Sequence, residues 1–187
     1  MASDDLRPQL SHLGIYTDHQ DEMQAFYEAV LGLVVTDCGV AHKFKRRIVF
    51  MSSSPEQHHQ FVLVRREPGD PQRGPLFQLS FKVATLSGLR AARERALGHG
   101  ATNFRPMNHG NSWSLYFNDP EENTVEVYMD TPWYVSQPFA DDLDLGLPDA
   151  EIHRITEARL REIESYRPAA EWSAAMSTRL ANHPYAR

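Results

Sequence analysis

Leu10-Ser-His-Leu-Gly-Ile-Tyr-Thr17 and Phe77-Gln-Leu-Ser-Phe-Lys-Val83 are two stretches of apolar and small residues with the character of short β-strands. A polar turn follows each stretch, and then comes a segment whose apolar residues fall at helical spacing. The two helical segments close on Gly32 and Gly98, residues that commonly end helices. The same order of elements therefore occurs twice in the chain.

Three further strand candidates follow each helix, so each half has the order β-α-β-β-β. Such a repeat indicates a duplicated unit that cannot bury its apolar face alone. The sequence predicts an α+β fold with modules over residues 1–67 and 76–130, joined by a Pro- and Gly-rich linker over 68–75. The six strands are expected around 33–36, 47–51 and 61–66 in the first half and around 102–105, 113–117 and 124–129 in the second.

Residues 131–187 form a tail of different composition, which begins with an extended arm that carries aromatic residues. Helices are predicted over 148–166 and 169–181, and this part of the chain packs either on its own domain or on a partner subunit of a homo-oligomer. The apolar stripe of the first tail helix is expected to consist of Ile152, Ile155, Leu160 and Ile163.

The composition excludes several classes of protein. The chain has 187 residues, 41% of them hydrophobic, and a formal net charge of -6, which favours neither nucleic acid nor an anionic membrane as a partner. It has no stretch of about 20 apolar residues that could span a membrane, and its first residues lack the apolar core of a signal peptide. Its single cysteine, Cys38, cannot form an intramolecular disulfide, which is typical of a reducing compartment. We therefore expect a cytoplasmic protein.

Three residues are the first candidates for chemistry. His12 and Gln78 occupy matching positions at the openings of the two halves, and equivalent positions of paired repeats face one another across a pseudo-twofold axis. Glu126 stands between Val125 and Val127 on the last predicted strand. A carboxylate in such a place either points to solvent or is held inside by a cation.

These features resemble a known family. The β-α-β-β-β duplication, His12 on the first strand, and the run Asp119-Pro-Glu-Glu-Asn-Thr-Val-Glu126 are similar to the vicinal oxygen chelate superfamily. That superfamily groups glyoxalase I, type I extradiol dioxygenases, fosfomycin-resistance proteins and bleomycin-binding proteins, and the resemblance covers about residues 8 to 135. It implies paired modules that form a cupped mixed sheet around a divalent metal, with His12, Gln78 and Glu126 as the ligands.

Within the superfamily, the stretch His109-Gly-Asn-Ser-Trp-Ser-Leu-Tyr116 is most similar to the extradiol dioxygenases. The resemblance implies that His109 or Tyr116 hydrogen-bonds the bound catecholate and that His59 or His58 is the acid-base residue. The two adjacent histidines are expected to face opposite ways on a strand, so that at most one enters the cavity. Arg105, Trp113 and Trp133 are candidates for substrate contacts.

One position departs from the dioxygenase pattern, which has a second histidine where this chain has Gln78. Two histidines and a carboxylate form the triad of non-haem Fe(II) oxygenases, whereas glyoxalase I includes glutamine among its ligands. The resemblance thus implies an extradiol dioxygenase that uses Fe(II), with Mn, Zn or Ni as other metals, to cleave a small aromatic diol with O2. The alternatives are a glyoxalase-like metal-dependent lyase, isomerase or transferase, and a small-molecule binding protein without catalysis.

The candidate residues also have ordinary structural interpretations. His12 could be a hydrogen-bonded strand histidine, and Gln78 could bond backbone or water. His109 could belong to a simple turn, since glycine follows it. Tyr116 could be a core tyrosine with a satisfied hydroxyl. Arg105 could be a surface arginine, and Trp133 could anchor the tail.

Overall fold

The computed structural model describes residues 10–40, 45–55, 57–70 and 76–182. The first half consists of β1 (Leu13–Thr17), α1 (Gln20–Leu31), β2 (Val34–Val40), β3 (Arg47–Ser52) and β4 (Phe61–Arg65). The second half consists of β5 (Leu79–Lys82), α2 (Leu86–Gly98), β6 (Thr102–Asn108), β7 (Ser112–Asn118) and β8 (Thr124–Asp130). The predicted repeat is confirmed. Within the predicted linker over 68–75, residues 71–75 lie outside the described residues.

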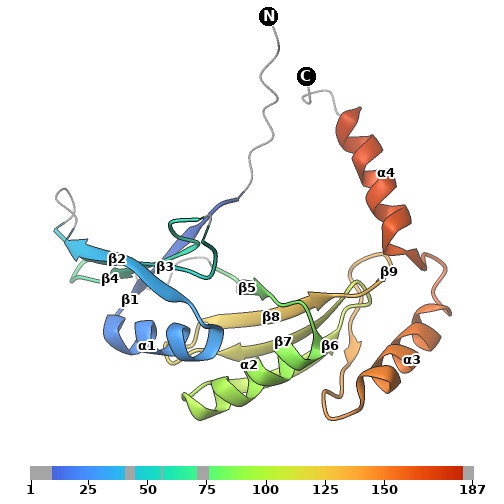
Figure 1. Cartoon of the computed structure of the whole chain (residues 1–187), viewed down its shortest axis with the longest axis horizontal. Coiled ribbons are helices and arrows are strands. Elements are labelled where there is room, and N and C mark those ends of the chain that lie inside the picture. Colours follow the sequence, from blue (N-terminus) through green and yellow to red (C-terminus); the bar gives the residue numbers. More distant parts are fainter. Residues whose placement is uncertain (1–9, 41–44, 56, 71–75, 183–187) are drawn as a thin grey trace, which may run out of the picture.

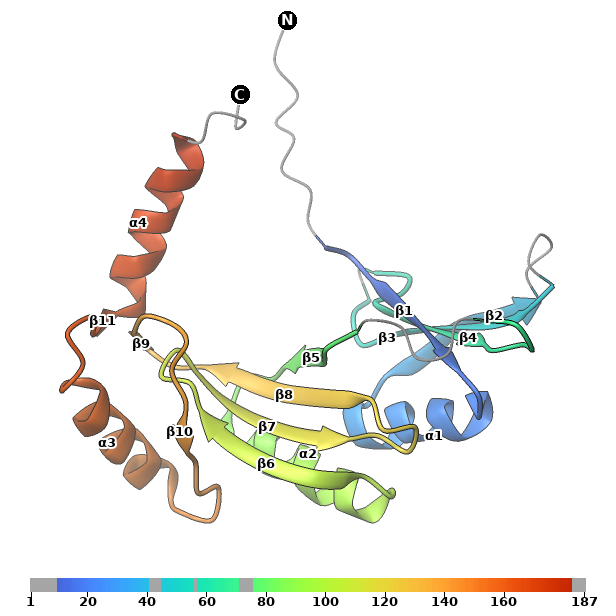
Figure 2. The same ribbon diagram turned by 180° about the vertical axis from the view of Figure 1, so that it is seen from behind.

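The two halves have the same strand pairing. One sheet has the order β1-β4-β3-β2, and the other has the order β10-β6-β7-β8-β5, where β10 is a short strand of the tail. β1 runs parallel to β4 and β5 runs parallel to β8, with Leu13 opposite Phe61 and Leu79 opposite Val125. The matching register makes the two halves comparable residue by residue. In Figures 1 and 2 both α1 and α2 lie on one side of the sheets.

The apolar faces of the two helices form the core between helices and sheets. Residues at helical spacing on α1, including Met23, Phe26 and Val30, are fully or almost fully buried. α1 ends at Gly32, whose left-handed conformation (φ 67°) lets its N–H bond to the carbonyl of Glu28. α2 differs slightly from expectation, because it includes Gly98, and the left-handed turn comes at Gly100 (φ 81°).

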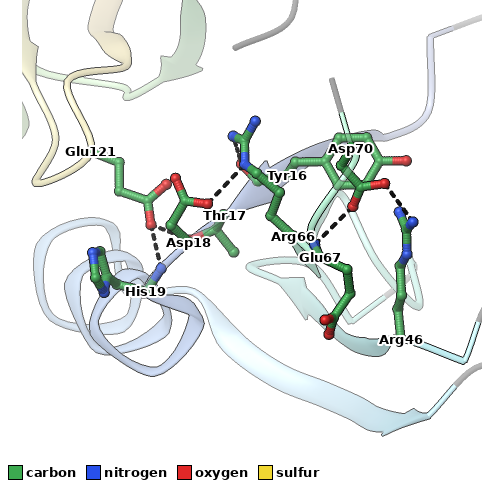
Figure 3. Close-up of polar contacts among 9 residues, drawn as sticks. All are labelled: Tyr16, Thr17, Asp18, His19, Arg46, Arg66, Glu67, Asp70 and Glu121. Atoms are coloured by element: carbon green, nitrogen blue, oxygen red, sulfur yellow. Dashed lines mark hydrogen bonds and ion pairs between the residues drawn. The ribbon is translucent and has the colours of Figure 1, made fainter. Parts of the chain in front are cut away.

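The turn after β7 joins the two halves. The buried Asp119 carboxylate accepts hydrogen bonds from the backbone of Glu121 and Asn123 and from the Tyr27 hydroxyl of α1, the last at 2.9 Å. Burial raises the pKa of Asp119, although the bonds from Asn123 oppose this shift. Glu121 Oε1 accepts from the Thr17 hydroxyl at 2.6 Å and from the His19 N–H at 2.7 Å (Figure 3). The Asp119–Glu126 motif of the sequence therefore has an architectural role in addition to carrying Glu126.

A cavity of about 930 Å³ lies beside this junction, between β1, Leu76 and Phe77, and the turn after Asp119. Asp18 and Arg66 of the first half line it and form an ion pair at 2.9 Å, and Arg46 forms a further ion pair with Asp70 (Figure 3). The Arg66–Asp18 pair joins the ends of β1 and β4 at the rim of the cavity, whereas the Arg46–Asp70 pair joins the residue before β3 to the segment after β4.

The tail contains β9 (Trp133–Tyr134), β10 (Asp141–Asp142), α3 (Asp149–Leu160), β11 (Arg167–Pro168) and α4 (Ala169–Ala181). α3 ends six residues earlier than the sequence indicates, because residues after Leu160 turn back so that β11 can pair with β9. Its buried face also differs from the prediction: Ile155 is 44% exposed, while Thr156 is buried and accepts a hydrogen bond from the Trp113 indole.

α3 packs on the second half, and α4 stands away from the sheets in Figures 1 and 2. The base of α4 is held by Trp172, whose ring stacks on Tyr134 at 5.5 Å between centroids. In the described part of the chain, none of the helices combines the length and the apolar character needed to cross a membrane.

Candidate functional site

Glu126 is the centre of a polar cluster on one face of the second sheet. Its side chain is only 7% exposed, and it accepts hydrogen bonds from Gln78 Nε2 (2.8 Å), Ser80 Oγ (2.6 Å) and the Tyr116 hydroxyl (2.6 Å). The register produces this arrangement, since Ser80 on β5 and Tyr116 on β7 both lie directly opposite Glu126 on β8. Three neutral donors solvate the carboxylate without cancelling its charge, so the place suits a cation.

His109 extends the cluster through Tyr116. Its Nε2 lies 3.1 Å from the Tyr116 hydroxyl, and its Nδ1 lies 2.9 Å from the carbonyl oxygen of Phe139 in the tail. A carbonyl can only accept, so Nδ1 carries a hydrogen. Burial, followed by the hydrogen bond and charge of Glu126, raises the pKa of Tyr116, so its hydroxyl keeps its proton near neutral pH. The cluster is thus a continuous chain from Phe139 to Glu126.

The single hydroxyl hydrogen of Tyr116 has two neighbours. Glu126 Oε1 is the nearer acceptor, at 2.6 Å, and His109 Nε2 is the farther one, at 3.1 Å. If a cation or a substrate proton occupies Glu126, the hydroxyl can instead donate to Nε2 of a neutral ring. The acceptor of the Tyr116 hydrogen therefore depends on what occupies Glu126, while Nδ1 keeps its bond to the Phe139 carbonyl.

The turn that carries His109 is a short hairpin between β6 and β7, as the following glycine suggests. The His109 N–H bonds to the carbonyl of Ser112 at 2.9 Å, and Gly110 has a φ of 73°. The turn interpretation of this residue is confirmed, and its ring contacts Tyr116, while its part in the chemistry stays a prediction.

Three histidines gather in the first half. The His12 and His59 ring centroids are 4.3 Å apart, and Nδ1 of His58 lies 2.9 Å from Nδ1 of His59. Both adjacent histidines also contact the Phe50 ring. The expectation that they face opposite ways is wrong, because they lie in the loop before β4, where the alternation of a strand does not apply. Partial burial lowers the pKa of His59, and His12 and His58 add to the shift.

His12 and Gln78 occupy equivalent places, as expected from the repeat, each immediately before the first strand of its half. Their contacts differ, since His12 lies against His59 whereas Gln78 bonds to Glu126. Among the described residues, no group of three or more His, Cys, Asp and Glu side chains is close enough to hold a metal ion. The expected set of His12, Gln78 and Glu126 includes only two residues of these four types, because Gln78 contributes an amide.

The donor types nevertheless fit a divalent cation. Gln78 gives its amide N–H groups to Glu126 and Ser80, which leaves its amide oxygen to face a cation. Together with a carboxylate and an imidazole, this oxygen makes a donor set compatible with Fe, Mn, Zn or Ni. Ser80 was not found from the sequence. The signal that could have identified it is its place two residues after Gln78 on a strand parallel to the one that carries Glu126.

The polar cluster is confined to the second half. Comparison of the registers places Val62 where Glu126 stands, Gly14 where Ser80 stands, and Phe50 where Tyr116 stands. On the matching face, the first half therefore contributes apolar side chains and the histidines of its loop. The carboxylate charge, that of Glu126, belongs to the second half.

The three residues predicted to contact the substrate lie in two different parts of the structure. Arg105 lies opposite Tyr116, with its guanidinium 5.8 Å from the centre of that ring, so it adjoins the cluster. Trp113 is fully buried on the other face of β7. Trp133 packs edge-on against Trp113 and against His153 of α3. The structure thus brings Arg105 to the cluster and places both tryptophans with the tail helix.

This fold of two β-α-β-β-β modules with matching strand pairing defines the class of protein. Residues 9–127 match the Glyoxalase/Bleomycin resistance protein/Dioxygenase superfamily, and the chain belongs to this family, the vicinal oxygen chelate superfamily.

Relatives and solved structures agree with this assignment. The chain is 28% identical over 128 residues to biphenyl-2,3-diol 1,2-dioxygenase 3 of Rhodococcus globerulus, a match that covers 66% of this chain and 64% of that protein. The chain therefore matches less than two thirds of that relative's length. A glyoxylase/bleomycin resistance protein/dioxygenase domain from Frankia sp. EAN1pec has a TM-score of 0.56 at 22% identity, over 67% of this chain and 99% of that one. The fosfomycin resistance protein FosX of Mesorhizobium loti has a TM-score of 0.52 at 20% identity, over 67% of this chain and 94% of that one. These two structures establish the fold.

Proposed function

We propose that this protein is an extradiol dioxygenase that uses O2 and a divalent metal to cleave the ring of a catechol-type aromatic diol. Fe(II) is the first choice of metal. The observation that carries the proposal is the hydrogen-bonded chain His109–Tyr116–Glu126, which joins a substrate-facing hydroxyl and imidazole to the expected metal carboxylate. The similarity to a biphenyl-2,3-diol dioxygenase supports the same substrate class.

In this proposal His12, Gln78 and Glu126 hold the metal. The bound metal would supply Lewis acidity to the diol oxygens and a place for substrate and O2 side by side. Ser80 and Gln78 orient the Glu126 carboxylate through their hydrogen bonds, as neighbours of metal ligands commonly do.

The other residues of the cluster act on the substrate. Tyr116 donates a hydrogen bond to the oxygen that becomes negative, His109 holds the Tyr116 hydroxyl in place, and Arg105 adds positive charge at the edge of the same face. His59 is the proposed proton acceptor, with His58 as the second choice. The lowered pKa of His59 leaves its ring neutral, and so able to accept a proton, at neutral pH.

One observation favours a second function. Gln78 bonds to Glu126 where the dioxygenase pattern has a histidine, and an amide oxygen suits a metal that polarises a substrate without activating oxygen. The second candidate is therefore an oxygen-independent, glyoxalase-like lyase, isomerase or transferase that uses Zn, Ni or Mn. A protein that only binds a small molecule is the third candidate.

Oxygen uptake separates these candidates. The full chain, loaded with Fe(II) under anaerobic conditions, is mixed with 2,3-dihydroxybiphenyl and then exposed to O2, while O2 consumption and the absorbance of a ring-cleaved semialdehyde are followed. Dioxygenase activity predicts one O2 consumed for each diol, and loss of turnover in Glu126→Gln but not in Glu171→Gln on α4. Anaerobic binding of catechols without O2 uptake would overturn the proposal and favour the second or third candidate.

A further inference from the structure

The first part of the tail is fastened to the turn that carries His109. The Thr131 N–H bonds to the carbonyl of Asn111 at 2.9 Å, and the Val135 N–H bonds to Asn111 Oδ1 at 2.8 Å. Gly110 lies directly beneath the tail, since a Cβ at this position would overlap the side chain of Val135. These contacts hold the tail against the turn without any contribution from the side chain of Gln137.

Gln137 adds a closed ring of three hydrogen bonds to this attachment. Its Nε2 donates to the backbone carbonyl of His109 at 2.7 Å, and its Oε1 accepts from the Phe139 N–H at 3.1 Å. The Phe139 carbonyl in turn accepts from Nδ1 of the His109 ring at 2.9 Å. One glutamine side chain therefore holds in position both the backbone of His109 and Phe139, whose carbonyl accepts the hydrogen of the His109 ring.

We propose that Gln137 is a positioning residue for His109, which fixes the hydrogen of the ring on Nδ1 and reserves Nε2 for Tyr116. This inference rests on the proposed function, because it assigns His109 a part in the chemistry. Which nitrogen of a histidine carries the hydrogen is set by the bond that the other nitrogen makes, and here the partner is a carbonyl that can only accept. The tail is thus part of the active site although none of its residues belongs to the His109–Tyr116–Glu126 chain.

Because Gln137 is exposed, its effect on His109 can be measured separately from the stability of the fold. The side chain of Gln137 is exposed, so its removal uncovers no apolar surface, and the bonds of Thr131 and Val135 to Asn111 remain. A Gln137 variant should therefore fold normally with the tail in place, while the His109 ring is free to turn and to exchange its hydrogen between the two nitrogens.

Two variants and a control test this. Gln137→Met keeps the length of the side chain but removes the donor and the acceptor, whereas Gln137→Glu keeps the acceptor for the Phe139 N–H and loses the donor to His109. Gln24→Met on α1 replaces a glutamine that bonds only to Glu28 on its own helix among the contacts described. All are studied as full chains free of paramagnetic iron, by 15N NMR of the imidazole nitrogens at an alkaline pH at which histidine rings are neutral.

The His109 resonances are assigned by their loss in His109→Gln. We expect a protonated Nδ1 and an unprotonated Nε2 in the wild type and in Gln24→Met, an averaged pair of signals in Gln137→Met, and an intermediate result in Gln137→Glu. His109 nitrogens in Gln137→Met that match the wild type would overturn the inference.

Kinetics then show whether positioning matters for catalysis. Gln137→Met should lower kcat about 10-fold, the smaller end of what a misoriented acid-base group costs, with KM and metal content nearly unchanged. A changed tautomer in a protein without dioxygenase activity would leave the positioning role intact and refute the proposed function alone. A changed tautomer with an unchanged kcat in an active dioxygenase would overturn the catalytic part of the inference.

Discussion

The hydroxyl of Tyr116 lies 2.6 Å from Oε1 of Glu126, a short bond between directly opposite residues of β7 and β8. Strong hydrogen bonds to a buried carboxylate both stabilise its charge and fix its orientation. This bond makes Tyr116 the link between the expected metal carboxylate and His109, so changes on either side of it should have separable effects.

Glu126→Gln should nearly abolish metal binding. The substitution removes the buried charge that favours a cation, while one side-chain oxygen remains as an acceptor for either Tyr116 or Ser80, which donate to different oxygens of Glu126. We expect a loss of affinity of about 100-fold or more, beyond the 10–100-fold typical of changes among residues that only support the ligands. Metal content after equilibrium dialysis measures it, with Glu171→Gln as the control, and equal occupancy in both variants would contradict the assignment.

Gln78→His should be tolerated and should raise turnover of catechols, because it completes a triad of two histidines and one carboxylate. Oxygen uptake at matched metal content is the measurement. A variant that binds metal normally and turns over catechols no faster would indicate that the amide serves another reaction.

His59→Phe should lower turnover by about 10²–10⁴-fold while metal content and anaerobic catechol binding stay nearly intact, since a proton acceptor is lost and the ring is replaced by one of similar shape. His58→Phe tests the second choice for the same role. Tyr116→Phe and His109→Phe should cost less, because the first removes one hydrogen bond to the substrate oxygen and the second removes the ring that holds the Tyr116 hydroxyl. Wild-type turnover in all four variants would show that these residues do not have the proposed roles in a dioxygenase.

Tyr27→Phe should destabilise the protein by about 1–3 kcal/mol, because the buried Asp119 carboxylate loses a donor. Burial, with Asp119 nearby, raises the pKa of Tyr27 well above its usual value. A group whose pKa is raised by folding contributes stability below its unfolded pKa and loses it as the pH rises further. The wild type should therefore lose stability above about pH 10 more steeply than Tyr27→Phe.

Urea unfolding at pH 7 and across pH 9–11 tests both statements. Tyr16→Phe is the control, since Tyr16 is 41% exposed and Phe retains a ring for its contact with Arg46. Parallel alkaline losses in Tyr27→Phe and the wild type would show that Tyr27 does not contribute in this way.

Truncation after Asp130 should destabilise the second module, because Trp113 is fully buried and its indole bonds to Thr156 of α3. Loss of this cover exposes a large aromatic side chain, at a cost of about 1.5–3 kcal/mol for the side chain alone. Truncation after Pro168 removes only α4 and should leave stability and activity nearly unchanged. Thermal unfolding of both proteins decides the matter, and a stable, active chain ending at Asp130 would make the tail dispensable.

The order of elements could be read from local patterns. Apolar residues at Met23, Phe26 and Val30 predict α1, and the repeat predicts that His12 and Gln78 are equivalent. Such inferences succeed because helical and strand periodicities, and a glycine such as Gly32 that ends a helix, are properties of neighbouring residues.

Contacts between distant segments depended on tertiary structure. His58 and His59 lie together because a loop, not a strand, carries them. Ile155 is exposed because Thr156, which bonds to the Trp113 indole, occupies the buried face of α3. Glu126 could be a surface carboxylate or an enclosed one until the register placed Ser80 and Tyr116 opposite it. Gln137 gave no signal in the sequence, since its partners, His109 and Phe139, become neighbours only when the tail crosses the turn. Local periodicity specifies which residues share a face, but pairing across strands and the path of the tail determine which groups meet there.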